Sequence, residues 1–427
     1  MVKSVLMYAT SAWGPWLSQT QWTKIESVQR EAARIITGQY KSTPVESLME
    51  EAGLVEIEKE ARGRWAIQWE KSMRQEEDDP RRKMAEVAVA QRLKKVGWRK
   101  KAMDTHAQKI EQSVERSPFP KARSPWTSRV EMEVRCSESR GESAEENKAK
   151  AEQRIEADEV DVLMFTDGSA SEGWSNGGAA FVAMRRQEGK WTIVQRQRAP
   201  AGKICSSFQA EMRALQAALQ WLHQEKATWK IAKIVSDSQS SLKAVEQRQF
   251  DSRCELRAGV EEWLERLADP GRKLLLEWVP SQCGVDGNEK ADAEAAEAAK
   301  MNQDGVQCSF AGVKKRLQRV ERRKEWANGR CGKIYGEQAV NIAVEDSYTR
   351  AQIVSLARLR SGHSMELAGY RKRIEVEEDG NCPRCGEEEE TVEHLFVCPA
   401  GEIMRRMCGV DRIDDLVRKP AENLLIG

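Results

Sequence analysis

The feature that most constrains the fold is the stretch 159–301, in which apolar segments of strand length alternate with amphipathic helical segments. Short apolar runs bounded by Gly, Pro or Asp predict strands, and apolar residues three and four apart predict helices. Three strands in series, followed by alternating helix and strand, predict a mixed five-stranded sheet with flanking helices, an α/β fold. The expected strands are 160–166, 179–184, 191–196, 231–235 and 274–279, and the expected helices are 206–224 and 288–300.

Four acids in this stretch are placed so that their carboxylates could meet. Asp167 and Asp237 each follow a strand, and neighbouring parallel strands bring such ends side by side. Glu211 and Asp292 each lie one turn into a helix. One acid at a strand end is usually an ordinary surface residue, but four converging carboxylates disfavour joint ionisation unless cations neutralise them. Oxygen ligands select Mg²⁺ or Mn²⁺, and two such ions can hydrolyse a phosphodiester.

The residues around the four acids resemble the ribonuclease H family. The matching motifs occur in order, as Phe165-Thr166-Asp167-Gly168-Ser169, Gln209-Ala210-Glu211, Val235-Ser236-Asp237-Ser238, and Trp278-Val279-Pro280 with Gly287-Asn288-Glu289-Lys290-Ala291-Asp292. The resemblance implies endonucleolytic hydrolysis of the RNA strand of RNA/DNA hybrids. It also implies that Asp167, Glu211, Asp237 and Asp292 are catalytic ligands of two Mg²⁺ or Mn²⁺ ions. The RNA strand would be selected through its 2′-hydroxyls and backbone shape.

One position departs from the family pattern. Many members carry a histidine in the loop after the last strand, where this chain has Gln282 followed by Cys283. Glutamine can hydrogen-bond to a phosphate or a water but cannot transfer a proton near neutral pH. We therefore expect metal binding to be retained and turnover to be slow.

Three cysteines and a histidine form a second cluster, Cys382-x2-Cys385-x8-His394-x3-Cys398. Cysteines two apart can chelate one ion from a tight turn, and three sulfurs with one nitrogen make a closed tetrahedral zinc site. A closed site has no position for substrate, so we predict one structural Zn²⁺. The remaining cysteines are scattered, which argues against a disulfide framework and favours an intracellular chain.

Both flanks resemble parts of non-LTR retrotransposon polyproteins. Residues 359–363 (Leu-Arg-Ser-Gly-His), Tyr370 and the run 382–399 resemble the segment that follows ribonuclease H in those polyproteins. Residues 8–14 and 29–38 resemble the end of the reverse transcriptase that precedes it. The paired-aspartate motif of a polymerase is absent, so no polymerase activity is expected. The chain is thus expected to be a truncated element or one piece of a longer protein.

Charge is distributed in blocks, although Lys+Arg and Asp+Glu total 69 and 68. Residues 92–129 carry 11 Lys/Arg against three acids, and 314–333 carry nine against two; 131–161 carries 11 acids against five Lys/Arg. Basic blocks outside the nuclease segment predict contacts with RNA/DNA hybrid, unless they are simply solvated faces. Single-stranded nucleic acid is a further expected partner, by analogy. The oligomeric state does not follow from the sequence.

These patterns divide the chain into six regions. They are 1–72, a helical remnant of the transcriptase; 73–158, a charged arm and disordered linker; 159–301, the nuclease domain; 302–379, a basic helical region; 380–400, the zinc module; and 401–427, a tail. No signal peptide or membrane span is expected, so the nucleus or the cytoplasm is favoured over secretion. Two alternatives stay open: a catalytically weak or silent nucleic-acid-binding remnant of a retroelement, and a cellular ribonuclease H.

Overall fold

The computed structural model describes residues 2–86, 98–110, 115–120, 126–136, 143–247, 254–318 and 349–408. The chain divides into two compact units. One comprises Met1–Gln68, Ala88–Lys109 and Leu317–Gly427, and the other comprises Trp69–Val87 and Ile110–Arg316. Parts of the two predicted basic blocks and of the basic helical region, and the tail from residue 409, lie outside the described residues. No described helix is both long and apolar enough to span a membrane.

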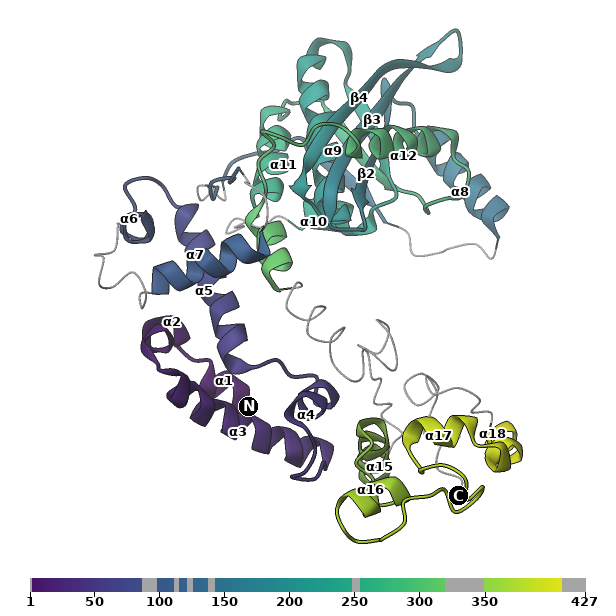
Figure 1. Ribbon diagram of the computed structural model, residues 1–427. Coiled ribbons are helices and arrows are strands. Elements are labelled where there is room, and N and C mark those ends of the chain that lie inside the picture. The colour runs from purple at the N-terminus through teal and green to yellow at the C-terminus, as the bar shows by residue number, and fades with distance from the viewer. Residues whose placement is uncertain are drawn as a thin grey trace. The chain divides into compact units, whose positions relative to one another are not determined.

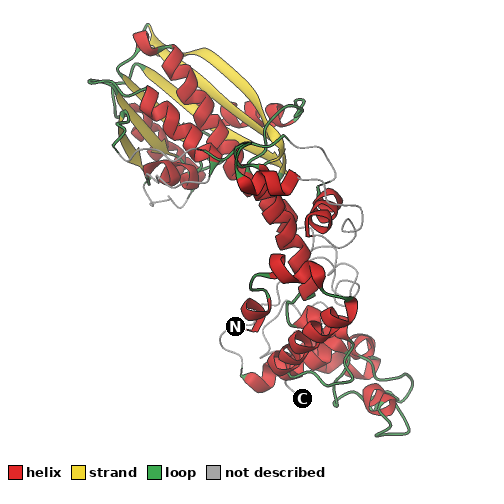
Figure 2. Cartoon of the chain, turned by 90° about the vertical axis from the view of Figure 1, so that its left-hand side faces the viewer, coloured by secondary structure: helices red, strands yellow, loops and turns green. Residues whose placement is uncertain are grey.

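All named strands belong to one six-stranded sheet in the second unit (Figure 2). The strands are β1 (Glu131–Arg135), β2 (Val162–Ser171), β3 (Ser175–Gln187), β4 (Lys190–Ile204), β5 (Ile231–Ser236) and β6 (Lys273–Trp278). Their order is β1-β6-β5-β2-β3-β4; β1, β6, β5 and β2 run parallel, and β3 pairs antiparallel with both β2 and β4. The mixed sheet with flanking helices confirms the predicted fold class.

Helices cover both faces of the sheet, because alternate residues of the central strands point to opposite sides. Val162 and Met164 of β2 join one core with α9 (Ser207–Gln224), α10 (Gln239–Glu246) and α11 (Glu255–Arg266). Leu163 and Phe165 join the other core with α8 (Ala144–Glu156) and α12 (Asp286–Ala299). Figure 1 shows these helices around β2, β3 and β4.

Helices α8, α10 and α11 and strand β1 of this unit were not predicted individually. The sheet has a sixth strand, β1, and the expectation of a disordered linker up to residue 158 is wrong for residues 144–156, which form α8. Ala151 and Ile155 of α8 are buried, and β1 pairs with β6 along its whole length. Both segments are polar, so each is stabilised by partners distant in sequence and not by its own apolar pattern.

The first unit is helical. Its helices are α1 (Val2–Leu6), α2 (Thr10–Trp13), α3 (Gln19–Thr37), α4 (Val45–Glu51), the first two thirds of α5 (Ile57–Met73), α7 (Trp98–Lys109), α15 (Arg350–Ser361), α16 (Ala368–Arg373), α17 (Val392–Val397) and α18 (Glu402–Cys408). Gly38 ends α3 in the left-handed conformation, as its position predicts. Pro44 directly precedes α4, and the Thr43 hydroxyl donates to the Gln39 side-chain oxygen at 3.1 Å.

The start and the end of the chain share one core in this unit. Gln39 donates to the carbonyl of Ala357 at 2.6 Å, and the Arg360 guanidinium pairs with buried Glu51 at 2.6 Å. Tyr370 accepts or donates a hydrogen bond at 2.8 Å with Ser42. The predicted transcriptase-like start and the segment 350–374 therefore form one structure, although more than 300 residues separate Gln39 from Ala357 in the chain.

Candidate active site and metal centre

Three of the four predicted acids converge. Carboxylate oxygens of Asp167, Glu211 and Asp237 all lie within 4.8 Å of one another. Asp167 lies within β2 and not after it, and the β2–β5 register pairs Thr166 with Ser236, so the two aspartates follow paired residues. Asp292 is exposed on α12 and is not one of the three acids that all lie within 4.8 Å of one another, but its side chain forms a hydrogen bond with Asp167 and its charge acts on that residue.

Gly168 allows helix α9 to approach the strand closely. A Cβ built at Gly168 would lie 2.1 Å from the backbone nitrogen of Glu211 and 2.3 Å from the carbonyl carbon of Ala210. No side chain fits in that space. Ser206 and Gln209 form a capping box at the start of α9, which fixes the first turn and so the position of Glu211.

Burial and the neighbouring carboxylate charges disfavour the ionised forms of Asp167 and Glu211. Burial raises the pKa of Asp167 to about 7, and the charges of Asp237 and Asp292 act in the same direction. Burial also raises the pKa of Glu211 well above its usual value, and the charge of Asp167 adds to the effect. The backbone N–H of Gly168 partly offsets both shifts. Such shifts mark a site that is suited to bind cations.

Asn288 is a site residue that the sequence reasoning did not identify. Its Nδ2 donates to Asp237 Oδ2 at 3.4 Å, and its side chain is buried at the start of α12. The Nε1 of Trp278 donates to the Asp237 carbonyl at 3.0 Å. These contacts orient Asp237 from both ends of the loop that joins β6 to α12. The only available signal was the position of Asn288 inside the motif that leads to Asp292.

The structure also brings together the four predicted zinc ligands. One ligand atom from each of Cys382, Cys385, His394 and Cys398 lies within 4.8 Å of the others. Cys382 Sγ is 3.8 Å from Cys398 Sγ, and Cys385 Sγ is 3.3 Å from His394 Nε2. The turn after Cys382 is closed by Gly386, whose N–H donates to the Cys382 carbonyl at 2.7 Å.

Neighbouring groups orient His394 and favour the thiolate form of Cys385. Glu388 accepts from His394 Nδ1 at 3.0 Å, which leaves Nε2 facing the sulfurs. The backbone N–H of Glu387, aided by that of Glu388, lowers the pKa of the Cys385 thiol to about 7. A thiolate is the form that binds metal.

The surface around the cluster is acidic. Residues 375–393 contain nine acids, all exposed except Glu390, and a single basic residue, Arg384. Phosphates would be repelled by this charge. Binding of single-stranded nucleic acid by this module stays a prediction, with electrostatics against it.

Comparison with protein families finds a match over this part of the chain. Residues 159–300 match the model of the family described as RNase H. The chain contains an RNase H domain. Its extent agrees with the range 159–301 expected from the sequence. No curated protein matches the chain.

Two solved structures are similar to this RNase H domain. One is the N-terminal RNase H domain of Rv2228c from Mycobacterium tuberculosis, solved as a fusion with maltose-binding protein. It is 20% identical, and the alignment covers 33% of this chain and 95% of that chain, with a TM-score of 0.27. The other is RNase H1 from the halophilic archaeon Halobacterium salinarum NRC-1. It is 22% identical, with coverages of 33% and 97% and a TM-score of 0.26.

The loop that carries Gln282 lies beside the acid cluster of the RNase H domain. Val279 at its start donates to the Ser236 carbonyl at 3.1 Å, and Asn288 at its end contacts Asp237. Gln282 is exposed and has a left-handed backbone, with φ of 54°. Buried Cys283 donates to the Pro280 carbonyl at 3.0 Å, so its thiol faces the loop interior and not the acids.

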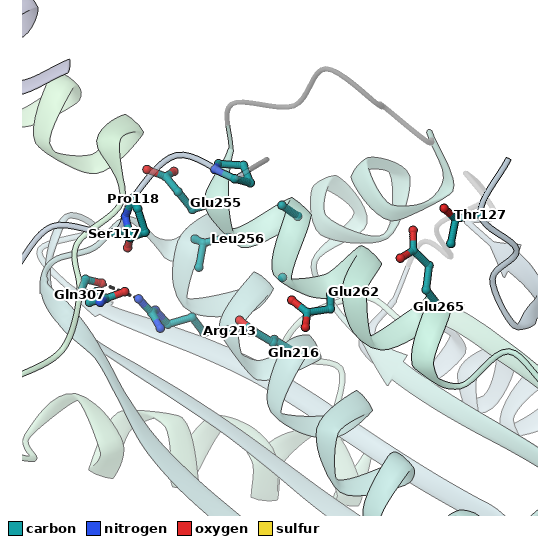
Figure 3. Close-up of a pocket in the computed structure, with 13 residues that line it drawn as sticks. Ser117, Pro118, Thr127, Arg213, Gln216, Glu255, Leu256, Glu262, Glu265 and Gln307 are labelled. Atoms are coloured by element: carbon teal, nitrogen blue, oxygen red, sulfur yellow. Dashed lines mark hydrogen bonds between the residues drawn. The ribbon is translucent and has the colours of Figure 1, made fainter. Parts of the chain in front are cut away.

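A cavity of about 560 Å³ lies elsewhere in the unit, between α9, α11 and the segment before β1 (Figure 3). Arg213 and Gln216 line it from α9, and Glu255 and Glu262 line it from α11. None of Asp167, Glu211 and Asp237 lines this cavity. The cavity is therefore separate from the acid cluster, in which Asp167 and Glu211 are buried and Asp237 is half-buried.

Without divalent cations, we expect the free energy of unfolding to fall as pH rises from about 4 to about 7. The pKa of Asp167 is about 7 in the folded chain, so in this window the folded chain binds more protons than the unfolded chain. Urea denaturation in EDTA at pH 5 and pH 7.5 measures the effect. The wild type should lose on the order of 2–3 kcal/mol more than Asp167→Asn between these pH values. Equal losses would show that Asp167 titrates normally.

Proposed function

We propose that the RNase H domain hydrolyses the RNA strand of RNA/DNA hybrids endonucleolytically, with two Mg²⁺ or Mn²⁺ ions. The observation that carries the proposal is the convergence of Asp167, Glu211 and Asp237 within 4.8 Å. Three carboxylates form a hard oxygen donor set, which fits these ions. Glu211 Oε2 is buried and has no hydrogen-bond partner among the described residues, as expected of a ligand atom. Asp292, which is exposed on α12, would be the fourth carboxylate ligand.

The residues of the site would have different roles in the proposed reaction. Bound cations would activate water and stabilise the leaving oxygen of the phosphodiester. Asp167, Glu211 and Asp237 hold the charge, and Asn288 fixes the carboxylate of Asp237. Gln282 can donate a hydrogen bond to a phosphate or accept one from water. It cannot protonate a leaving group, so this step falls to solvent.

The direct test uses an internally labelled RNA/DNA hybrid, with the same RNA single-stranded and the same sequence as duplex DNA. We expect internal RNA cuts in the hybrid alone, in Mg²⁺ or Mn²⁺, and none in EDTA. Cleavage of free RNA at an equal rate would contradict the assignment of the hybrid as substrate. Cleavage that persists in EDTA would contradict the metal-dependent mechanism.

Replacing Gln282 by His is expected to raise kcat by about tenfold or more at neutral pH, since a positioned acid or base contributes about 10²–10⁴-fold. The side chain is exposed, so the change should leave stability unaltered. Single-turnover cleavage of saturating hybrid by both proteins measures the effect, with Gln282→Ala as the control for loss of the amide. An unchanged rate in Gln282→His would show that this loop position does not limit turnover.

Gln282 also favours a second candidate function, a weak or silent enzyme that binds hybrids. In its silent form, this second function predicts hybrid binding by the wild type in Mg²⁺ without product. Detection of product that disappears in Asp167→Asn would exclude it.

We further propose that Cys382, Cys385, His394 and Cys398 hold one structural Zn²⁺, and that the protein derives from a non-LTR retroelement. The first part is supported by the sulfur and nitrogen donor set and by the contact of Glu388 with His394. The second is supported by the transcriptase-like start and by the position of the Cys/His cluster after the RNase H domain. Purification of the native protein with retroelement RNA would test the second part.

A further inference from the structure

Helix α8 lies outside the residues that match RNase H, yet it contacts the loop that carries Gln282. Ala151 and Ile155 of α8 pack in one core with Cys283 and Val285 of that loop. Lys148 precedes Ala151 by three residues and so shares its face of the helix. The Cδ of Lys148 lies 3.7 Å from the position that a Cβ would take at Gly284.

Buried charges fix α8 in this place. Lys233 of β5 is fully buried and donates to the carbonyls of Arg154 and Ile155 at 2.8 and 2.9 Å, at the C-terminal end of α8. Lys233 also pairs with Asp158 at 2.7 Å, and Asp158 pairs with Arg135 of β1 at 2.6 Å. An amine buried in the sheet thus caps the helix, so the position of Lys148 is set by the core.

The Lys148 amine is available to a ligand. Its side chain is 45% exposed, and its contact with Glu152 is long, at 3.8 Å. Lys150, two residues further on, is exposed to the same extent but pairs closely with Glu146, at 2.5 Å. Lys290 at the start of α12 is likewise paired with Asp286, at 2.5 Å. Of these three lysines, Lys148 alone lies against the loop and has only a distant partner.

We propose that Lys148 binds a backbone phosphate of the nucleic acid next to the acid cluster. The inference rests on the proposed function, because the Gln282 loop adjoins the acid cluster at which the substrate would bind. A phosphate contact positions the strand without reading its sequence. Lys148 would thereby contribute affinity at a site whose own residues are mostly acidic.

The experiment compares Lys148→Ala with Lys150→Ala and Lys148→Arg. Hybrid affinity is measured by fluorescence anisotropy from 50 to 200 mM salt, in an Asp167→Asn background that prevents cleavage. Lys148→Ala should weaken binding by about tenfold at low salt and reduce the salt slope by about one, whereas Lys150→Ala should match the parent. Lys148→Arg should retain affinity. In the active protein, Lys148→Ala should raise KM more than it lowers kcat.

The outcomes separate this inference from the proposed function. Equal affinities and equal salt slopes for the two alanine variants would overturn the role of Lys148, whether or not the wild type cleaves hybrid. Absence of cleavage by the wild type would overturn the proposed reaction, and the binding comparison would still report on Lys148. A lower thermal midpoint for Lys148→Ala than for Lys150→Ala, with unchanged salt slope, would assign Lys148 a packing role and also overturn the proposal.

Discussion

Asp167→Asn should lower the rate of hybrid cleavage by at least about a thousandfold, because it removes a central cation ligand from the proposed site. Asp167 is 5% exposed, and one of its carboxylate oxygens lies within 4.8 Å of oxygens of Glu211 and Asp237. Asparagine has the same shape, so the fold should be unaffected. The rate is measured under single-turnover conditions in Mg²⁺. Asp269→Asn is the matched control, since it removes an acid that pairs with Arg272 outside the cluster.

The same substitution should stabilise the metal-free protein. Asp167 is held among like charges, and its removal relieves their repulsion, which raises the free energy of unfolding at neutral pH. A loss of activity joined to a gain in stability is the signature of a functional site, and a variant that merely misfolds shows the opposite. Cleavage that persists in purified Asp167→Asn would point to a contaminating nuclease or to a different catalytic set.

The acid cluster was predictable because local sequence patterns identify the strands that precede Asp237 and contain Asp167, and neighbouring parallel strands bring such positions side by side. β2 is apolar on both faces up to Thr166, which identifies a central strand, and its parallel pairing with β5 places Asp237 beside Asp167. The position of Asp292 outside the group of three acids was not predictable. Helical spacing shows on which face of a helix a residue lies, but it does not give the distance of that residue from the sheet.

β1 and α8 were not predicted because their sequences are mostly polar. Two buried side chains, Ala151 and Ile155, are too few to define an amphipathic pattern in a helix with nine charged or amide residues. Lys233 holds α8 in place by donating to a carbonyl at its C-terminal end. In the sequence, this lysine interrupts an otherwise apolar strand. Glu277 of β6 is 1% exposed in the same region. Interactions of this kind depend on strand order, which composition does not reveal.

The core of the first unit was not predicted because its contacts join residues that lie far apart in the chain. Gly38 ends α3 in the left-handed conformation that glycine favours. It also contacts α15, where a Cβ at Gly38 would lie 2.5 Å from a Val354 methyl. Contacts that join residues this far apart follow from tertiary packing alone.

Removal of zinc is the second change with a large expected effect. The cluster has only a small apolar core, in which Leu367, Tyr370 and Val392 are the buried members. Small domains of this size depend on a metal for stability, and apparent binding energies of structural zinc are about 10–16 kcal/mol. We therefore expect one zinc per chain by elemental analysis. A strong chelator, or Cys382→Ser, should abolish the amide protection of residues 380–398 in hydrogen exchange.

The control for this prediction is Cys136→Ser, which changes a free cysteine in β1's flank and should leave the zinc content at one per chain. Hybrid cleavage separates structural from catalytic roles. A closed site of three sulfurs and one nitrogen offers no position for substrate, so Cys382→Ser should reduce activity far less than Asp167→Asn does. A metal-free preparation in which residues 380–398 stay protected would contradict the zinc assignment.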